Sequence, residues 1–534
     1  MTTSEVAPAS LTAETTSPDS RSDWLRRDRV VVAGLVVLAV ALRAPYLGRA
    51  FWVDEGITVG ISSHPISQIP RLLRNDGSPP LFYFLLHFWM RVFGSSEPAA
   101  HALPLLISLL AIPVGYWAGR ELFNRRGAGI AAAALVATNP FLNWYSTEAR
   151  MYTLVILLAL VGVTLAWRAF RDRRLIDAAG AVLAYAALLY THNWAIYLTG
   201  GTGLVLLWLA WSRGDRRLTA WVVAGGAATL VLWLPWLPSF IYQAQNTAAP
   251  WAVQPGIGDF FADPSTALAG TIGFLVVPAL VIGVWLGRRD VAPADRLVAG
   301  AVGTMALATT VAGFVGAEIE PSWTVRYLAV IVGPYLIAAA GALSAGRTGR
   351  RVLWATCAAL SVWALIGLLL PNPNGRYAKS NVAAVASAVA PRLRPGDAVL
   401  VTQTEQLAVA YHYLPRGMQY MTPTGPVTDP SVVNWRNIVY RLQHASPCAV
   451  LGPTLNALPV GAAVLEINPA RKLGASGSAW SRAVSSQVLA DNRFLARDRA
   501  LTTEGLYTPG LSPKPFSPVD GVLFQKTSAA PACG

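Results

Sequence analysis

Long apolar stretches separated by short polar connections dominate the first 370 residues of the chain. A helix needs about 20 residues to cross a bilayer, and eleven stretches reach or approach that length. They lie near residues 30–47, 101–119, 128–145, 151–168, 176–191, 194–212, 220–240, 266–287, 297–316, 327–346 and 352–370. The pattern therefore predicts an α-helical polytopic membrane protein with about 11 transmembrane helices.

One apolar segment, residues 79–93, does not fit this series. It reads PPLFYFLLHFWMRVF, begins with two prolines, and contains His87 and Arg91. Counting it as a span would move every later connection to the opposite side of the membrane. We expect a short interfacial or re-entrant helix instead.

Arginine residues mark alternate connections between the predicted spans. These are Arg120, Arg125 and Arg126, then Arg168, Arg171, Arg173 and Arg174, then Arg213, Arg216 and Arg217, then Arg288, Arg289 and Arg296, then Arg347, Arg350 and Arg351. Because basic residues favour the cytoplasmic side, the N-terminus is predicted in the cytoplasm. An odd number of spans then places the C-terminus outside. The first apolar run lacks a small-residue cleavage site, so it predicts a retained helix.

The composition changes after residue 370 and predicts a second domain. PNPNGRYAKSN is polar and rich in turn residues. Residues 378–391 and 404–414 then favour helices, whereas AVLVTQ at 398–403, CAVLGP at 448–453 and GVLFQK at 521–526 favour strands. We expect three parts: a disordered cytoplasmic N-terminal tail (1–29), a transmembrane domain (30–370) with its first external loop at 48–100, and a C-terminal extracytoplasmic α/β domain (371–534).

Composition and charge agree with a membrane protein of the cell (plasma) membrane. The chain is 54% hydrophobic and 13% charged, whereas soluble domains carry about 25% charged residues. The formal net charge of +14 is explained by topology, and the basic residues do not alternate with aromatic residues as nucleic-acid binding would require. We therefore expect the lipid bilayer as a partner and no nucleic acid.

Three cysteines are present, without the spacing of a metal site. Cys357 falls in an apolar run. Cys448 and Cys533 can form one disulfide if their domain is extracytoplasmic, and two unpaired thiols fit the sequence equally well.

The first external loop reads LGRAFWVDEGITVG and carries Asp54 and Glu55 a few residues after the first span. A carboxylate at the membrane surface can act as a general base on an acceptor hydroxyl. A neighbouring acid can bind a divalent ion or orient the acceptor. Two solvated loop acids are the simpler interpretation of these residues taken alone.

Two further acidic elements lie on the same predicted side. Asp76 precedes a Gly–Ser–Pro–Pro sequence that is also ordinary turn chemistry. The short connection NPFLNWYSTEARMY holds Glu148 and Arg150 between Tyr145 and Tyr152. Charged residues at the edge of the hydrocarbon region are costly unless paired or used. An arginine there can bind a lipid phosphate through two N–H groups of its planar guanidinium, although a Glu148–Arg150 surface pair is the alternative.

Three more candidates complete the outer set. His192, in THNW, can bind a phosphate or a sugar hydroxyl, or simply end a helix. Arg326, in EIEPSWTVRY, is a second candidate for lipid phosphate. Arg43, in the outer part of the first span, either reaches this surface or snorkels. Each signal is weak alone, and their common side is the stronger argument.

The ordered motifs WVDEG, GSPPLFYFLLHFW, PFLNWYSTEARMY, YTHNW and VRYLAVIVGPYL resemble the polytopic glycosyltransferases of the GT-C superfamily. The resemblance is closest to the branch of protein-O-mannosyltransferases and aminoarabinose transferases, family 39. It covers about residues 30–370, and more loosely the external domain.

This resemblance implies a reaction and roles for several residues. Such enzymes take a sugar from a polyprenyl-phosphate donor on the non-cytoplasmic face and pass it to a hydroxyl acceptor. Asp54 matches the catalytic base and Glu55 completes the pair, while Asp76 and Glu148 fall where relatives place metal- or substrate-binding acids. The chain departs from the family where a Glu–Lys–Pro pattern reads Asp–Gly–Ser–Pro. The lysine of that pattern would contact the donor phosphate, so its loss makes Arg150 and Arg326 more important for binding the phosphate.

The resemblance thus implies an inverting glycosyltransferase with catalytic residues Asp54 and Glu55. A divalent metal ion is a candidate cofactor, with Asp76 and Glu148 as candidate ligands. Mannose is the first choice of sugar and arabinofuranose or another pentose the second; the acceptor is a protein, a glycolipid or a glycan. A transporter would favour midplane charges and a repeat, and a non-enzymatic scaffold is the third alternative. The predicted substrate-binding residues are Arg43, Asp76, His87, Tyr145, Glu148, Arg150, Tyr152, His192, Arg326 and Tyr327.

Overall fold

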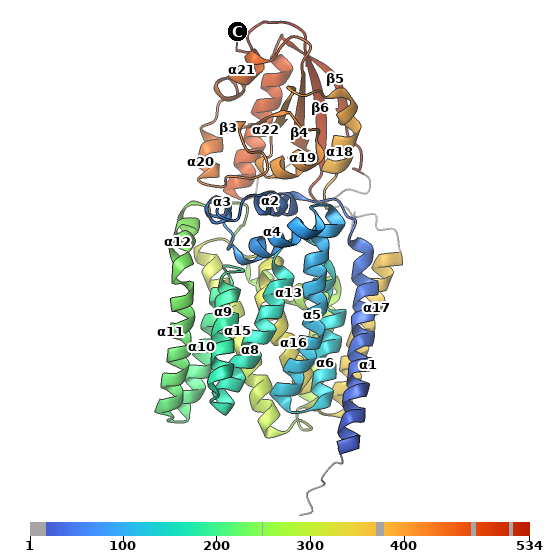
Figure 1. Ribbon diagram of the computed structural model, residues 1–534, viewed down its shortest axis with the longest axis vertical. Helices are drawn as coiled ribbons and strands as arrows, with labels where there is room; N and C mark the ends of the chain where they lie inside the picture. The colour runs from blue at the N-terminus through green and yellow to red at the C-terminus, as the bar shows by residue number, and fades with distance from the viewer. Residues whose placement is uncertain (1–17, 248, 370–378, 471–476, 512–515, 534) are drawn as a thin grey trace, which may run out of the picture.

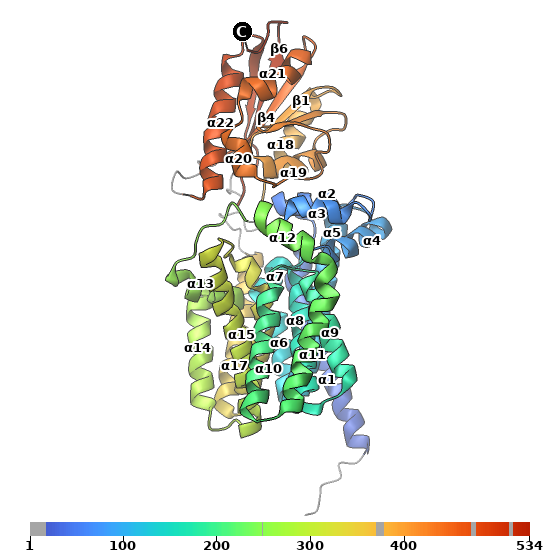
Figure 2. The same ribbon diagram turned by 90° about the vertical axis from the view of Figure 1, so that its left-hand side faces the viewer.

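A bundle of long helices carries a smaller α/β domain on one end (Figure 1). The fold is given by a computed structural model that describes residues 18–247, 249–369, 379–470, 477–511 and 516–533. A view turned by 90° shows the same two layers, with short helices lying between them (Figure 2). The chain is therefore a multi-pass membrane protein with a C-terminal α/β domain, which confirms the predicted fold class.

The bundle is built from helices that coincide with the predicted apolar stretches. They are α1 (Pro18–Arg43), α5 (Glu97–Phe123), α6 (Arg126–Thr138), α8 (Tyr152–Asp172), α9 (Leu175–Leu189), α10 (Ala195–Ser212), α11 (Arg216–Trp233), α14 (Gly273–Gly287), α15 (Pro293–Ile319), α16 (Ala329–Leu343) and α17 (Arg347–Leu369). Among the described residues, nine helical segments are long and apolar enough to cross a membrane. Helices α6 and α9 are shorter, with 13 and 15 residues, so the count of about 11 spans stays a prediction.

Short helices lie at the junction between the bundle and the α/β domain. They are α2 (Val53–Ser62), α3 (Ile69–Asp76), α4 (Leu81–Phe93), α7 (Pro140–Tyr145), α12 (Leu237–Asn246), α13 (Ile257–Ala269) and the 3-10 helix η4 (Val325–Leu328). Helix α4, the anomalous apolar segment, has 13 residues and lies across the end of the bundle (Figure 1). Its side chains Phe88, Val92 and Phe93 are exposed, as expected of an interfacial helix.

The α/β domain contains one six-stranded mixed sheet in the order β3-β2-β1-β4-β6-β5. Strand β1 is parallel to both β2 and β4, and the other pairs are antiparallel. All four residues of β1 are buried, as expected for a central strand covered on both faces. The elements are α18 (Val382–Val389), β1 (Ala398–Val401), η6 (Thr404–Gln406), α19 (Leu407–Tyr413), β2 (Gln419–Thr422), β3 (Gly425–Val427), α20 (Ile438–Gln443), α21 (Pro447–Ala457), β4 (Ala463–Pro469), α22 (Ala479–Arg497), β5 (Leu501–Tyr507) and β6 (Val519–Lys526).

Two local predictions are corrected. Residues 448–453 were expected as a strand but lie in helix α21, where Leu451 and Leu455 point to the core one turn apart; a short apolar run does not distinguish a strand from a buried helix. The expected disordered tail (1–29) overlaps α1, which already begins at Pro18. Residues 1–17 and the predicted boundary at 370 lie outside the described residues.

A disulfide joins Cys448 on α21 to Cys533 near the C-terminus. The third cysteine, Cys357, is free and buried in α17. Of the two pairing states that the sequence left open, the structure contains the bridge.

Helix α2 is held between the bundle and the α/β domain (Figure 1). A Cβ atom on Gly56 would lie 2.7 Å from the backbone nitrogen of Val409, and one on Gly60 would lie 1.8 Å from the carbonyl oxygen of Ser431. These glycines therefore allow the backbone of the α/β domain to approach the helix directly. Beyond its end, His64 Nε2 contacts Asp429 Oδ2 at 2.8 Å.

Candidate active site

The first turn of α2 places Asp54 and Glu55 at the junction between the two domains. Acidic residues suit this position because the free backbone N–H groups of a helix N-terminus attract negative charge. The backbone N–H of Trp52 also donates to Glu55 Oε2 at 3.3 Å. Two adjacent positions on a helix point in different directions, so the two acids enter different surroundings.

Asp54 forms an ion pair with Arg326 of η4, with 2.8 Å between Oδ2 and Nη1. Each side chain is 17% exposed, so the pair is reachable from outside the protein. The guanidinium of Arg326 also stacks over Trp251, 4.6 Å from the ring centroid. The structure thus joins two residues that the sequence predicted separately, 272 positions apart.

Glu55, in contrast, is almost completely buried and fully engaged. Its Oε1 accepts from the backbone N–H of Ala149 at 2.9 Å and contacts His101 Nε2 at 2.6 Å. Burial raises the pKa of Glu55, but His101 and Lys379 outweigh that effect and hold its pKa below the usual range. Glu55 therefore remains ionised and ties α2 to the loop before α8.

Glu148 lies in that loop and forms a buried ion pair with Lys379, just before α18. The ammonium group also lies 5.6 Å from the ring centroid of Trp52 and 5.1 Å from that of Trp144. Burial raises the pKa of Glu148 despite the lysine. Within the part of the chain that the structure describes, Glu148 Oε1 has no hydrogen-bond partner.

A second polar chain begins at Arg150, two residues further on. Its Nη1 donates to Thr58 Oγ1 at 2.8 Å and to the Tyr83 hydroxyl at 3.1 Å. The Tyr83 hydroxyl in turn donates to Asp76 Oδ2 at 3.2 Å. Burial raises the pKa of Asp76, although Arg150 partly offsets the effect. The chain connects α2, α3, α4 and the loop before α8.

Aromatic rings fill the space beside these charges. Tyr145 and Tyr152 pack with ring centroids 4.8 Å apart, and His192 packs against Tyr327 at the same separation. Burial, together with Arg150 and Arg326, lowers the pKa of His192 to about 3. His192 is therefore neutral at physiological pH and can accept or donate a hydrogen bond without adding charge.

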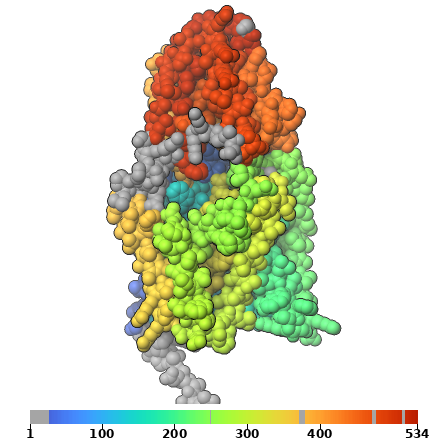
Figure 3. Space-filling view, turned by 180° about the vertical axis from the view of Figure 1, so that it is seen from behind, coloured from blue at the N-terminus to red at the C-terminus, as the bar shows by residue number. Residues whose placement is uncertain are grey.

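Two cavities adjoin the charged residues. One, of about 250 Å³, is lined by Arg150, His192 and Tyr327 together with polar side chains of α12 and the loop after α15. The other, of about 350 Å³, is lined by Trp144, Tyr145 and apolar side chains, with Arg49 among them. Seen from behind, the surface is hollowed between the α/β domain and the bundle (Figure 3).

Two predicted substrate-binding residues lie elsewhere. Arg43 is fully buried, and its five N–H groups donate to Asn143, Ser108 (twice), Val136 and Ala137. It therefore neither snorkels nor has a donor left for substrate. His87 points to the end of α2, where Nδ1 contacts the carbonyl oxygen of Ser62 at 2.9 Å. Arg43 is thereby corrected to a packing residue, whereas a substrate-binding role of His87 stays a prediction.

The two predicted metal ligands are engaged by different protein side chains. Asp76 is bonded to Tyr83, and Glu148 is paired with Lys379. In the described ranges, no group of three or more His, Cys, Asp and Glu side chains could hold a metal ion. A metal-binding role of Asp76 and Glu148 stays a prediction.

Residues of the site that sequence reasoning missed include Trp52, Tyr83, His101 and Lys379. Lys379 offered a signal, because the chain has only four lysines and this one lies nine residues after the last predicted span. The other three lie in apolar or aromatic runs where no local pattern separates them from core residues.

Comparison with known proteins agrees with this architecture. The family model described as dolichyl-phosphate-mannose-protein mannosyltransferase matches residues 77–238. No curated protein matches the sequence significantly.

Solved structures match nearly the whole chain. ArnT from Cupriavidus metallidurans in the apo state has a TM-score of 0.61 at 16% identity, covering 94% of this chain and 98% of that one; the same protein has also been solved with undecaprenyl phosphate. The oligosaccharyltransferase AglB from Archaeoglobus fulgidus has a TM-score of 0.52 at 10% identity, covering 91% and 74%. The arabinofuranosyltransferase AftD from mycobacteria has a TM-score of 0.53 at 15% identity, covering 94% and 40%.

The helical bundle, the junction helices and the α/β domain share the fold of the polytopic glycosyltransferases ArnT and AglB. The chain is a membrane glycosyltransferase whose architecture is similar to that of ArnT and the protein mannosyltransferases. The expected resemblance is thereby confirmed.

Proposed function

We propose that the chain transfers a sugar from a polyprenyl-phosphate donor to a hydroxyl acceptor, with Asp54 as the general base. The observation that carries the proposal is the Asp54–Arg326 pair, a partly exposed carboxylate and guanidinium 2.8 Å apart at the domain junction. Undecaprenyl phosphate bound to ArnT and dolichol phosphate bound to AglB support a lipid-phosphate donor.

The proposed step is a single displacement. The acceptor oxygen attacks the anomeric carbon while Asp54 takes its proton. The bond between that carbon and the phosphate oxygen breaks, and its electron pair leaves with the polyprenyl phosphate. Because attack and departure occur on opposite faces, the anomeric configuration inverts.

The donor phosphate would lie among three cations that share two tryptophans. Lys379 and Arg326 lie 5.6 and 5.9 Å from the Trp52 ring centroid. Lys379 and Arg49 lie 5.1 and 5.7 Å from the Trp144 centroid. Fixed cations stabilise charge that develops on a leaving phosphate without reorganisation at the moment of reaction. Lys379 thus supplies the lysine that the Asp–Gly–Ser–Pro segment lacks.

The two cavities suggest where the substrates lie. The apolar cavity beside Trp144 and Arg49 suits the first part of a prenyl chain. The more polar cavity beside Arg150 and His192 suits the sugar or the acceptor. Mannose is the preferred sugar because the matching family model is described by mannosyl transfer. A pentose is the second candidate because AftD transfers arabinofuranose. A protein, a glycolipid or a glycan supplies the acceptor hydroxyl.

The proposed orientation places this site and the α/β domain outside the cell and the N-terminus in the cytoplasm. The arginine-rich connections support it, because they lie at the end of the bundle opposite the α/β domain. The charges of the site gather at one end of the bundle, which favours an enzyme over a transporter with midplane charges.

Replacing Asp54 by asparagine tests the proposal. Loss of a general base costs about 10²–10⁴ in rate, so Asp54→Asn membranes should transfer almost no labelled sugar from synthetic polyprenyl-phosphate mannose or arabinofuranose. Asp172→Asn, an exposed acid at the other end of the bundle, is the matched control. Near-normal transfer by Asp54→Asn, with either donor, contradicts the proposal.

A further inference from the structure

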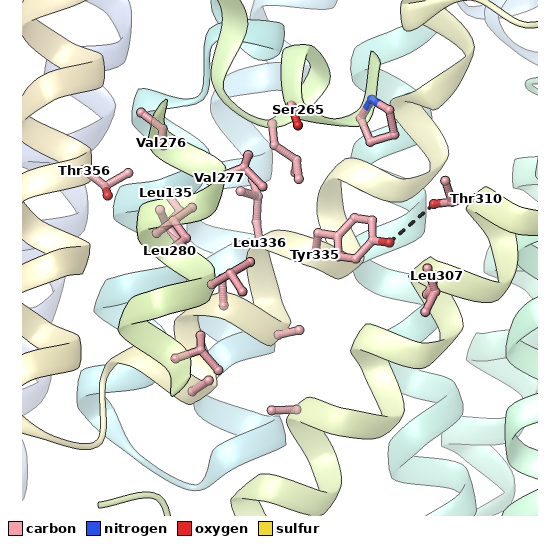
Figure 4. Close-up of a pocket in the computed structure, with 18 of the residues that line it drawn as sticks. Leu135, Ser265, Val276, Val277, Leu280, Leu307, Thr310, Tyr335, Leu336 and Thr356 are labelled. Atoms are coloured by element: carbon pink, nitrogen blue, oxygen red, sulfur yellow. Dashed lines mark hydrogen bonds between the residues drawn. The ribbon is translucent and has the colours of Figure 1, made fainter. Parts of the chain in front are cut away.

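A cavity of about 610 Å³, larger than either cavity at the active site, lies along the helices of the bundle. It opens between α14 and α15 and is bounded by α13, α16 and α17 (Figure 4). Leu280 and Val277 of α14 face Leu336 of α16 across it, and Leu307 of α15 lines its side. Tyr335 and Thr310 place a hydroxyl pair, 3.4 Å apart, on its wall. The lining is otherwise predominantly apolar, which suits hydrocarbon.

The cavity runs along α14 toward the end of the bundle that lies away from the α/β domain. Its lining begins at α13, with Phe260 and Phe261, and ends at Arg288 and Arg296. Between Val276 and Arg288 it follows twelve residues of α14 and its C-terminal end, which is roughly 18 Å of helix. Half of a typical hydrocarbon core is about 15 Å, so this part of the cavity is long enough for the acyl chains of one leaflet.

Two arginines mark the end of the cavity that lies away from the α/β domain. Arg288 follows α14 and Arg296 belongs to α15, and both line the cavity. Arg288 stacks on Trp285, 4.3 Å from its ring centroid. Of the nearby acids, Asp295 is paired with Arg125 at 2.7 Å, and Asp290 lies against Gly346. The mouth thus presents two guanidinium groups from two different helices.

We propose that this cavity binds an anionic glycerophospholipid of the leaflet opposite the α/β domain. The acyl chains fill the space between α14 and α15, and the phosphate lies between Arg288 and Arg296. A sugar donor would place its phosphate at Asp54, at the other end of the bundle, and only its prenyl tail could enter the cavity, so Arg288 and Arg296 would meet no phosphate. The bound lipid replaces helix–helix packing that α14 and α15 lack along the cavity, and so stabilises this side of the bundle.

Native mass spectrometry of the full-length protein in detergent tests the proposal, with phosphatidylglycerol and phosphatidylcholine of equal chain length as probes. The wild type should retain phosphatidylglycerol preferentially. Each arginine near a membrane surface contributes about 1 kcal/mol to the attraction of anionic lipid, or roughly five-fold in affinity. Arg288→Gln/Arg296→Gln should therefore lower the affinity for phosphatidylglycerol roughly 25-fold.

A matched charge control is Arg289→Gln/Arg217→Gln, which removes two arginines from the same end of the bundle but not from the cavity. It should retain the lipid as the wild type does. Gly300→Leu adds a side chain where a Cβ meets nothing within 4 Å, so it should fold normally, narrow the cavity and retain less lipid than the wild type.

Equal retention of both phospholipids by the wild type overturns the proposal. So does equal loss of phosphatidylglycerol in the two arginine double variants. Displacement of the lipid by polyprenyl phosphate, without effect of the Arg288 and Arg296 changes, overturns it in favour of a donor-tail site.

Discussion

Individual residues of the active site act in charge pairs drawn from distant segments. Asp54 meets Arg326, Glu55 meets His101, and Glu148 meets Lys379. Exposed pairs contribute little to stability, but breaking a buried pair leaves an uncompensated charge. The Glu148–Lys379 pair is buried on both sides, so its removal should affect both stability and catalysis.

Lys379→Met should lower the unfolding free energy by roughly 3–5 kcal/mol, because it leaves the buried carboxylate of Glu148 without a cation. Glu148→Gln/Lys379→Met should restore most of the thermal midpoint, since no unpaired charge remains. It should not restore sugar transfer, because the cation for the donor phosphate is still missing. Measuring both quantities separates the two roles; a double variant that recovers full activity would show that the pair is purely structural.

A buried acid of the α/β domain predicts a pH effect with a definite sign. Burial raises the pKa of Glu466 on β4 to about 8, and Asp491 and Asp520 add to the effect. Between its ordinary value of 4.5 and about 8, the folded chain holds a proton that the unfolded chain releases. Stability should therefore fall as the pH rises through this window.

Glu466→Gln should flatten this dependence and raise the thermal midpoint at pH 8 by several degrees. Glu504→Gln removes an exposed acid paired with Arg392 and should leave the dependence unchanged. Thermal unfolding of the two variants at pH 5 and pH 8 checks the sign, and a midpoint that increases with pH in the wild type refutes it.

At the scale of elements, α2 matters most, because it carries Asp54 and touches both domains. Gly60→Ala would place a Cβ 1.8 Å from the carbonyl oxygen of Ser431, and a backbone atom cannot move aside as a flexible side chain can. The helix should shift, and the transfer rate should fall at least ten-fold, since small misplacements of a catalytic group are costly. Gly34→Ala on α1, where a Cβ meets nothing within 4 Å, is the control and should transfer normally.

Elements could be predicted where hydropathy or alternation is strong. The bundle helices follow the apolar runs, and β1 and β6 follow AVLVTQ and GVLFQK. Strands β2, β3, β4 and β5 were not predicted, although β4 contains the apolar run AVLEINP. Its buried Glu466 interrupts that run and obscures the pattern. The strand predicted at residues 448–453 was wrong, because Pro447 starts a helix there and the apolar run alone does not reveal it.

The candidate site could be predicted only as a list of residues on one side. The topology placed Asp54, Glu148, Arg150, His192 and Arg326 together, because all lie at the same end of their helices. It did not distinguish Arg43, whose donors are taken by the protein, from Arg326, whose guanidinium meets Asp54. Pairings across hundreds of residues depend on packing that no local pattern records.

At the scale of the whole molecule, the disulfide tests the proposed orientation. The Cys448–Cys533 bridge closes a loop of 85 residues, and such bridges persist only in oxidising compartments. The protein from cells should therefore carry the bridge, detectable by mass spectrometry without reduction. Cys448→Ser/Cys533→Ser should lower the unfolding free energy of the α/β domain by about 2–4 kcal/mol. Recovery of both cysteines as free thiols contradicts the outward placement, and Cys357→Ser is the control.

The way in which the α/β domain touches α2 bears on how the enzyme can evolve. At Gly56 and Gly60 the contact is made by backbone atoms of Val409 and Ser431, which every amino acid possesses. Side chains of this domain can therefore diverge while α2 keeps its position. Insertions or deletions that change the path of the chain at these two places would displace α2. Related proteins should thus differ in the side chains and outer loops of the domain and keep its path over α2.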